Sequence, residues 1–322
     1  MNGGRITRAF DNDWIGPALV CIIAVVVISI LQPSFLSPFN ILVLLSAIAV
    51  NMLIGLGQLV IIAVGQMNLA LGSIGGLVAI SFAAMMELWN LPPLLAMCGG
   101  LAIGIAAGMA SGFVIARTGI SAFIITLAGL QIFKGINLGI TKAQPFYGVP
   151  QSVKDFGNLA MAGPIPWLVL PMVVASLAIW ILFNRLRIGR YILAIGGNRN
   201  AAELSGINLD TTVIWAHGIS GCLAAMAGMM LVARLQIGHP AIGEDWLISS
   251  FAAPVIGGAI LSGGHVSVAG TFFGVVIIAI ITQALVLFAI DPFVVQIVLG
   301  GLILWAVGIN RFREMRVAKA RA

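Results

Sequence analysis

Apolar runs, each approaching the length of a membrane-spanning helix, follow one another along most of the chain. A helix that crosses a bilayer needs about 20 predominantly apolar residues. Ten segments fit this pattern, the eighth of them short: Trp14 to Leu31, Asn40 to Gly65, Met67 to Met86, Pro93 to Ala116, Ser121 to Gly139, Trp167 to Phe183, Thr211 to Ala233, Ser249 to Leu261, Val268 to Phe288 and Pro292 to Ile309. The pattern predicts one all-α polytopic membrane domain of about ten helices, some of them short or broken.

One long polar stretch, residues 185–210, interrupts these apolar segments. It contains GRYILAIGGNRNAAELSGIN, which predicts a turn at Gly196 and Gly197 and then a very short helix. Asn200 is a candidate N-cap for this helix, and Gly206 can end it in a left-handed conformation. A helix of this length is not stable alone in water. We therefore expect it to pack on its own protein or on a partner.

The distribution of charge gives an orientation. The chain is 61% hydrophobic and only 8% charged, with a net charge of +6, and Lys and Arg accumulate on the cytoplasmic side of membrane proteins. Most basic residues lie in residues 1–13, 185–210 and 310–322, which we expect to be cytoplasmic, whereas the long loop 141–166 is expected to be periplasmic. Because this pattern accounts for the positive charge, no nucleic-acid partner is implied.

Polar residues within apolar segments are candidates for a solute pathway, because unpaired polar groups are unfavourable in hydrocarbon. One glycine-interrupted segment lies in each half of the chain, an arrangement that points to repeat architecture and to a transporter's binding site. The alternative is that about half of these side chains only bond neighbouring helices. Neutral amides suit a hydroxylated solute better than an ion. The candidate pathway residues are Asn51, Gln58, Gln66, Asn68, Gln131, Asn137, Trp246, Ser249, Ser250 and Gln283.

Two ionisable residues within the apolar segments each have two interpretations. Lys134 is either a buried charge or, more simply, a side chain that extends to the outer interface. His217 is either a proton relay or a partner in a hydrogen bond between helices, and the absence of a carboxylate within four residues favours the hydrogen bond.

Several function classes lack their usual residues. The sequence has no phosphate-binding G-x-x-x-x-G-K-[ST] motif, so ATP hydrolysis would require another polypeptide. It has no series of intramembrane acids for ion coupling, and no paired carboxylates or His cluster that would indicate a membrane enzyme. We expect no metal and no cofactor. An amino-acid cargo would need opposite charges within the membrane, and the sequence suggests no such pair.

The chain resembles the permease subunits of bacterial ATP-binding-cassette importers for ribose, xylose, arabinose and galactose, which are related to branched-chain amino acid permeases. The resemblance covers Asn40 to Arg311, and its most specific part is GRYILAIGGNRNAAELSGIN; NLALGS, AFIITL with the following KG, ARL, GGAILSGG and VAGT support it. It implies an inner-membrane homodimer, or a dimer with a paralogous permease, surrounded by membrane lipids. Cytoplasmic ATPase subunits and a periplasmic solute-binding protein are its implied partners.

The same resemblance implies that the short helix couples the permease to the ATPase. The implied coupling residues are Gly196, Gly197, Asn198, Asn200, Ala201, Ala202, Glu203, Leu204 and Gly206. Asn68 departs from the family pattern, in which an aspartate usually occupies this position. The departure leaves the cargo open among a monosaccharide, a polyol, a signalling carbohydrate, an amino acid and a nucleoside. An ion-coupled secondary transporter is the remaining alternative.

Overall fold

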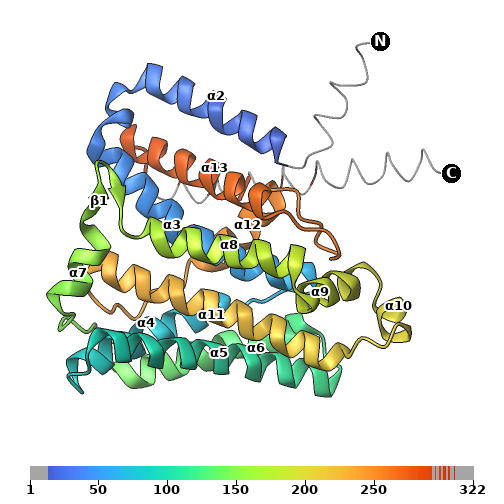
Figure 1. Cartoon of the computed structure of the whole chain (residues 1–322). Coiled ribbons are helices and arrows are strands. Elements are labelled where there is room, and N and C mark those ends of the chain that lie inside the picture. Colours follow the sequence, from blue (N-terminus) through green and yellow to red (C-terminus); the bar gives the residue numbers. More distant parts are fainter. Residues whose placement is uncertain are drawn as a thin grey trace, which may run out of the picture.

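A computed structural model describes residues 14–291 and positions 294, 297, 298, 300, 301, 304 and 308. The predicted span Pro292 to Ile309 lies largely outside these residues. The described chain is an all-α bundle (Figure 1), which confirms the predicted multi-pass membrane fold. Within it, five helices are long and apolar enough to cross a membrane: α3 (Pro38–Ala63), α5 (Pro93–Thr118), α6 (Ala122–Thr141), α11 (Leu209–Leu235) and α13 (Val268–Leu287).

Shorter elements complete the bundle. Helix α8 (Val169–Arg185) continues into α9 (Arg187–Gly197) through a bend of 71°. Three further apolar helices have 10–17 residues: α2 (Ile15–Leu31), α4 (Leu71–Glu87) and α12 (Trp246–Ile256). The remaining elements are η1 (Pro33–Leu36), α7 (Gln151–Asn158), the strands β1 (Ala160–Ala162) and β2 (Ile165–Pro166), and α10 (Arg199–Leu204).

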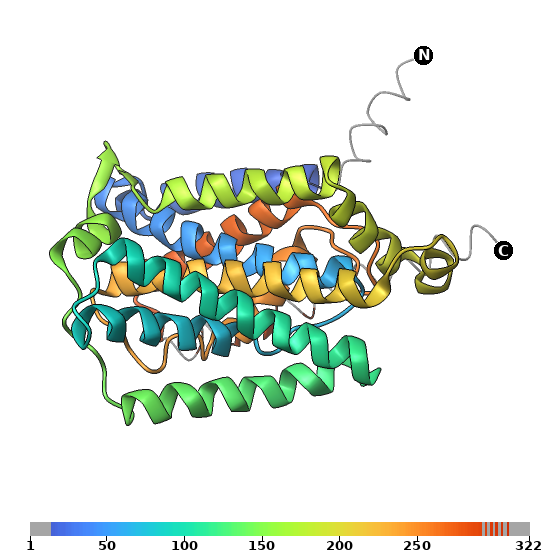
Figure 2. The same ribbon diagram turned by 60° about the horizontal axis from the view of Figure 1, so that its bottom comes forward.

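Different elements lie at the two ends of the bundle (Figure 1). Helix α7 and the β1–β2 hairpin lie at one, which we call the α7 end, and α9 and α10 lie at the other, the α10 end. Helix α3 passes through the centre of the bundle, and almost every residue from Ile48 to Ala63 is buried. Figure 2 shows α6, in green, at the edge of the bundle, where it packs mainly on α4.

Helices α4 and α12 both begin near the middle of the bundle and run in opposite directions. Asn68, just before α4, contacts Ser220 halfway along α11, and α4 ends beside the loop that follows α6. After α11 the chain turns back, so that Gly243 packs against Gly72 before α12 starts. The predicted spans Met67 to Met86 and Ser249 to Leu261 are therefore corrected to a partial crossing from Leu71 and an earlier helix from Trp246. Discontinuous helices of this kind are common in transporters.

Close packing of α5 on α11 depends on small residues, as is usual between membrane helices. Gly104 and Gly108 of α5 face Gly221 and the backbone of His217, and a Cβ atom on Gly108 would clash with the His217 carbonyl oxygen. The two helix backbones can approach this closely only because both faces lack side chains.

Replacing Gly108 by valine is expected to lower the free energy of unfolding by about 1–3 kcal/mol, because overpacking moves helices apart. Gly135→Ala in α6 is the matched control, since nothing lies within 4 Å of its Cβ position. Thermal unfolding in detergent, followed by tryptophan fluorescence, measures both. Equal midpoints for the two variants would contradict the tight contact.

Candidate functional site

The loop between α3 and α4 is fixed by buried side-chain hydrogen bonds. Asn68 is 1% exposed, its Nδ2 donates to Ser220 Oγ at 3.2 Å, and its Oδ1 accepts from Ala70 N at 3.0 Å. Gln66 Oε1 lies 3.0 Å from His217 Nε2. This contact agrees with the hydrogen-bond interpretation of His217, which here joins α11 to the loop. Thr126 Oγ1 of α6 accepts from Leu69 N at 3.1 Å.

The segment between α11 and α12 reaches the start of α4 through direct backbone contact. Gly243 adopts φ +92°, and its Cα faces the Gly72 carbonyl; a Cβ on Gly72, in turn, would clash with the Gly243 carbonyl oxygen. Ile242 O approaches Gly76 in the same way. Trp246, 4% exposed, fills the space beside Gly75. The starts of α4 and α12 are therefore held side by side.

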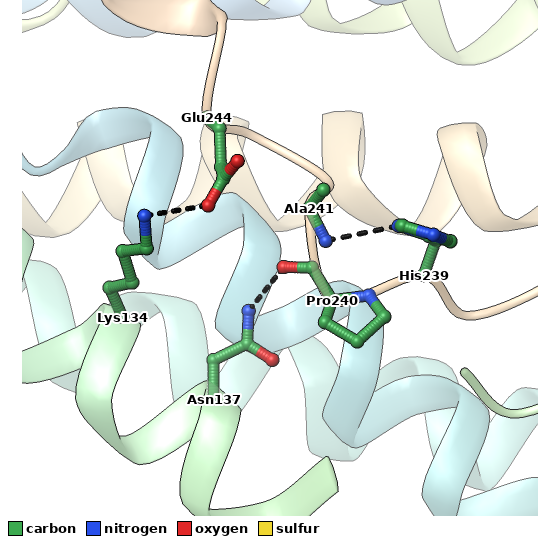
Figure 3. A network of polar contacts seen from close by, with 6 residues as sticks. All are labelled: Lys134, Asn137, His239, Pro240, Ala241 and Glu244. Atoms are coloured by element: carbon green, nitrogen blue, oxygen red, sulfur yellow. Dashed lines mark hydrogen bonds and ion pairs between the residues drawn. The ribbon is translucent and has the colours of Figure 1, made fainter. Parts of the chain in front are cut away.

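A cavity of about 90 Å³ lies at this meeting point, between α4, α6 and the segment before α12. Lys134 Nζ and Glu244 Oε1 form an ion pair of 2.7 Å across it, and Asn137 Nδ2 donates to Pro240 O at 2.9 Å (Figure 3). The buried-charge interpretation of Lys134 is thereby corrected, since its side chain is 43% exposed and paired with Glu244. The lining is Leu69, Gly72, Ser73, Leu130, Lys134, Asn137, Pro240, Ile242, Gly243, Glu244 and Leu247.

The other predicted pathway residues have different surroundings. Asn137 alone among them lines this cavity, and Gln66 lines a second cavity near Arg199 and Asp210 at the α10 end. The hydroxyl groups of Ser249 and Ser250 bond the backbone of their own helix. The others are buried (Gln58, with amide bonds to the Asn68 backbone), partly buried (Asn51, and Gln283 with its Nε2 on Asn40 Oδ1) or exposed on α6 (Gln131).

Glu244 and Ser73 are the polar cavity residues that the sequence did not single out. Ser73 directly follows Gly72 in NLALGS, and Glu244 with Asp245 precedes Trp246. Acidic residues just before a broken apolar segment were the available signal for Glu244. Its basic partner lies 110 positions away in the sequence, so only tertiary structure pairs the two.

The short helix α10 lies at the extreme of the α10 end (Figure 1). Its N-cap is Asn198, whose Oδ1 accepts from Ala201 N at 3.0 Å, and not Asn200 as predicted. Gly206 follows the helix in the predicted left-handed conformation, with φ +79°. Ala202 is buried, whereas the side chain of Leu204 is 90% exposed. An apolar side chain this exposed on a fixed helix is available to a partner.

A cluster of glycines joins α9, the helix that precedes α10, to the loops that adjoin the two broken helices α4 and α12. Gly196 lies inside α9, so the predicted turn at Gly196 and Gly197 is wrong; the chain turns at Asn198. A Cβ on Gly196 would clash with the Ala63 carbonyl oxygen at the end of α3. Gly263, with φ +95°, packs on Gly65 and Gly196, and Gly264 N donates to Ala63 O at 3.1 Å. We call Gly65, Gly196, Gly263 and Gly264 the glycine junction.

The sequence that folds into this arrangement matches a described family. The family profile "Branched-chain amino acid transport system / permease component" aligns with residues 38–307. The chain belongs to this permease family. It is therefore a multi-pass membrane protein and a component of a transport system.

Individual permeases are similar over nearly their whole length. The chain is 37% identical over 300 residues to the ribose import permease protein RbsC of Bacillus subtilis, covering 92% of each protein. It is 34% identical over 301 residues to the D-allose transport system permease protein AlsC of Escherichia coli, covering 93% of this chain and 92% of that one. The galactose/methyl galactoside import permease protein MglC of Salmonella typhimurium is 28% identical over 323 residues, covering 94% and 96%. No solved structure matches the chain.

Proposed function

We propose that this chain is the membrane-spanning permease subunit of an ATP-binding-cassette importer that carries a monosaccharide or a related polyol across the bacterial inner membrane. The similar proteins named above are permeases for ribose, allose and galactose. Each aligns over more than nine-tenths of this chain, so the cavity and α10 both lie within the aligned region.

The observation that carries the proposal is the exposed Leu204 on α10. The leucine is 90% exposed on a six-residue helix at the end of the bundle, where it is suited to contact a partner protein. The ATPase subunit is the partner we propose for it. Arg185, Arg187, Arg190 and Arg199 lie around the same end, and by the positive-inside rule they support a cytoplasmic location for it.

This orientation assigns the remaining partners. With both termini and α10 cytoplasmic, α7 and the β1–β2 hairpin face the periplasm, where a solute-binding protein would dock. A second copy of the chain, or a paralogous permease, would complete the pathway. ATP is hydrolysed on the separate cytoplasmic subunits, and the permease performs no covalent chemistry.

Transport then works by switching between two packings of the same helices. Closure of the ATPase subunits pushes on α10 and, through α9, on Gly196. The glycine junction passes this movement to the end of α3 and to the segment before α13, which flank the two broken helices. The direct backbone contacts at Gly196 and Gly263 leave no soft side chains to absorb the displacement.

An amino acid is the second candidate cargo, and one observation favours it. The sequence suggested no pair of opposite charges for such a cargo, whereas Lys134 and Glu244 pair in the cavity at 2.7 Å. A zwitterion offers a carboxylate and an ammonium group that match such a pair. We favour the sugar because the three similar permeases described above are all named for sugars.

Uptake of labelled solutes distinguishes the two. The chain, its ATPase and its binding protein are reconstituted in liposomes, and uptake of D-ribose, D-allose, D-galactose, sorbitol, L-leucine and a nucleoside is compared. We expect ATP-dependent uptake of a sugar or polyol. If only L-leucine or only the nucleoside is taken up, the sugar is not the cargo, and that solute takes its place.

A further inference from the structure

The cavity described above receives the N-terminal ends of two helices. In α4 and α12, which are both fully described, no side chain caps the first turn. The first N–H groups of a helix lack partners within the helix, and the dipole gives this end a partial positive charge. Gly72 and Ser73 of α4 and Leu247 of α12 line the cavity, so both ends face it.

Asn137 adds an unsatisfied acceptor to the same cavity. Its side chain is 3% exposed, and its Nδ2 is used by Pro240 O, whereas its Oδ1 has no hydrogen-bond partner among the described residues. Because a buried polar atom without a partner is unfavourable, a small rotation of the Asn137 side chain that brings this oxygen into the cavity would let it accept a hydrogen bond from a ligand. A neutral hydroxyl group is the donor that fits without adding charge.

Lys134 and Glu244 both line the cavity and pair with each other (Figure 3). The two side chains are 43% and 50% exposed, and an ion pair this exposed contributes little net stability. Its hydrogen bond can therefore be replaced by bonds to a ligand's hydroxyl groups. The volume of about 90 Å³ has room for several water molecules that such a ligand would displace.

We propose that this cavity is a monosaccharide-binding station within the permease, at which Lys134, Glu244 and Asn137 bind the sugar's hydroxyl groups. The inference rests on the proposed function and names the site at which it acts. Lys134 donates to a hydroxyl oxygen, whereas Glu244 Oε and Asn137 Oδ1 accept hydroxyl hydrogens. Leu69, Leu130 and Leu247 cover the C–H faces of the ring.

Charge-removing variants test this station in the reconstituted complex. Lys134→Met and Glu244→Gln are each expected to lower sugar uptake at least about tenfold. Arg117→Met is the control that also removes one positive charge, since Arg117 is an exposed residue in the last turn of α5, outside the cavity lining and on neither α7 nor α10. Wild-type uptake in both cavity variants would overturn the station and leave the permease function intact. If the wild-type complex transports no sugar, the proposed function fails, and the station fails with it.

A direct measurement covers the case in which a variant fails to assemble. Native Cys21, Cys98 and Cys222 are replaced by serine, Ser73→Cys is introduced into the cavity, and alkylation by N-ethylmaleimide is timed in the full complex. We expect D-ribose, or the sugar transported by the wild type, to slow alkylation at least about threefold. A variant that retains only Cys98, exposed on α5, is expected to show no change. Absence of protection, or protection by L-leucine and not by sugar, would overturn the proposal.

Discussion

Replacing Leu204 by aspartate is expected to abolish ATP-driven uptake by removing the ATPase from the permease. Leu204 is 90% exposed on α10 and is the apolar anchor that this helix presents. Truncating a central anchor of an interface costs about 2 kcal/mol or more, which corresponds to at least about a 30-fold loss of affinity. An aspartate adds an unpaired charge to the contact. The affinity of the purified permease for its ATPase is measured by surface plasmon resonance, with the permease immobilised.

Leu159→Asp is the matched control for this variant. Leu159 is also an exposed leucine, at 55%, but follows α7 at the opposite end of the bundle. We expect its affinity for the ATPase to equal that of the wild type. If Leu204→Asp binds the ATPase as tightly as Leu159→Asp does, α10 is not the docking helix.

Gly196→Ala is expected to uncouple ATP hydrolysis from uptake. The added methyl group would meet the Ala63 carbonyl oxygen and lie 2.5 Å from Gly264 N, so α9 must move away from the ends of α3 and the loop before α13. Overpacking of this kind costs about 1–3 kcal/mol. We expect uptake per ATP hydrolysed to fall at least about tenfold, because movement of α10 no longer reaches the two broken segments.

Gly197→Ala provides the neighbouring control, because nothing lies within 4 Å of its Cβ position. Its uptake and hydrolysis are expected to match the wild type. Both variants are first compared for expression and for a single peak in size-exclusion chromatography. If the Gly196→Ala protein takes up as much solute per ATP hydrolysed as the wild type, the glycine junction does not transmit the movement of α10.

The hydrophobic pattern was sufficient to predict the long helices, because their length and composition are local properties. The segments predicted at Pro93 to Ala116 and Thr211 to Ala233 agree closely with α5 and α11. The starts of α4 and α12 were not predictable in the same way. They are set by backbone contacts such as Gly72 with Gly243, which join residues far apart in the sequence.

In the functional regions, too, local features were predictable from the sequence and tertiary contacts were not. The short polar helix was predicted from its sequence, but its cap was not, because Asn198 and Asn200 are equivalent candidates until the end of α9 is known. Asn137 was a candidate pathway residue, and the structure places it at a cavity. The pairing of Lys134 with Glu244 depends on α6 packing beside the segment before α12, and no local pattern encodes that.

ATP dependence of solute entry tests the central claim most directly. Liposomes containing the permease, its ATPase and its binding protein are supplied with labelled sugar, with and without ATP, and compared with liposomes that contain the permease alone. The proposed function predicts uptake only when ATP and both partners are present. Uptake at the full rate by the permease alone would show that the chain is a self-sufficient carrier, and would contradict the coupling role assigned to α10.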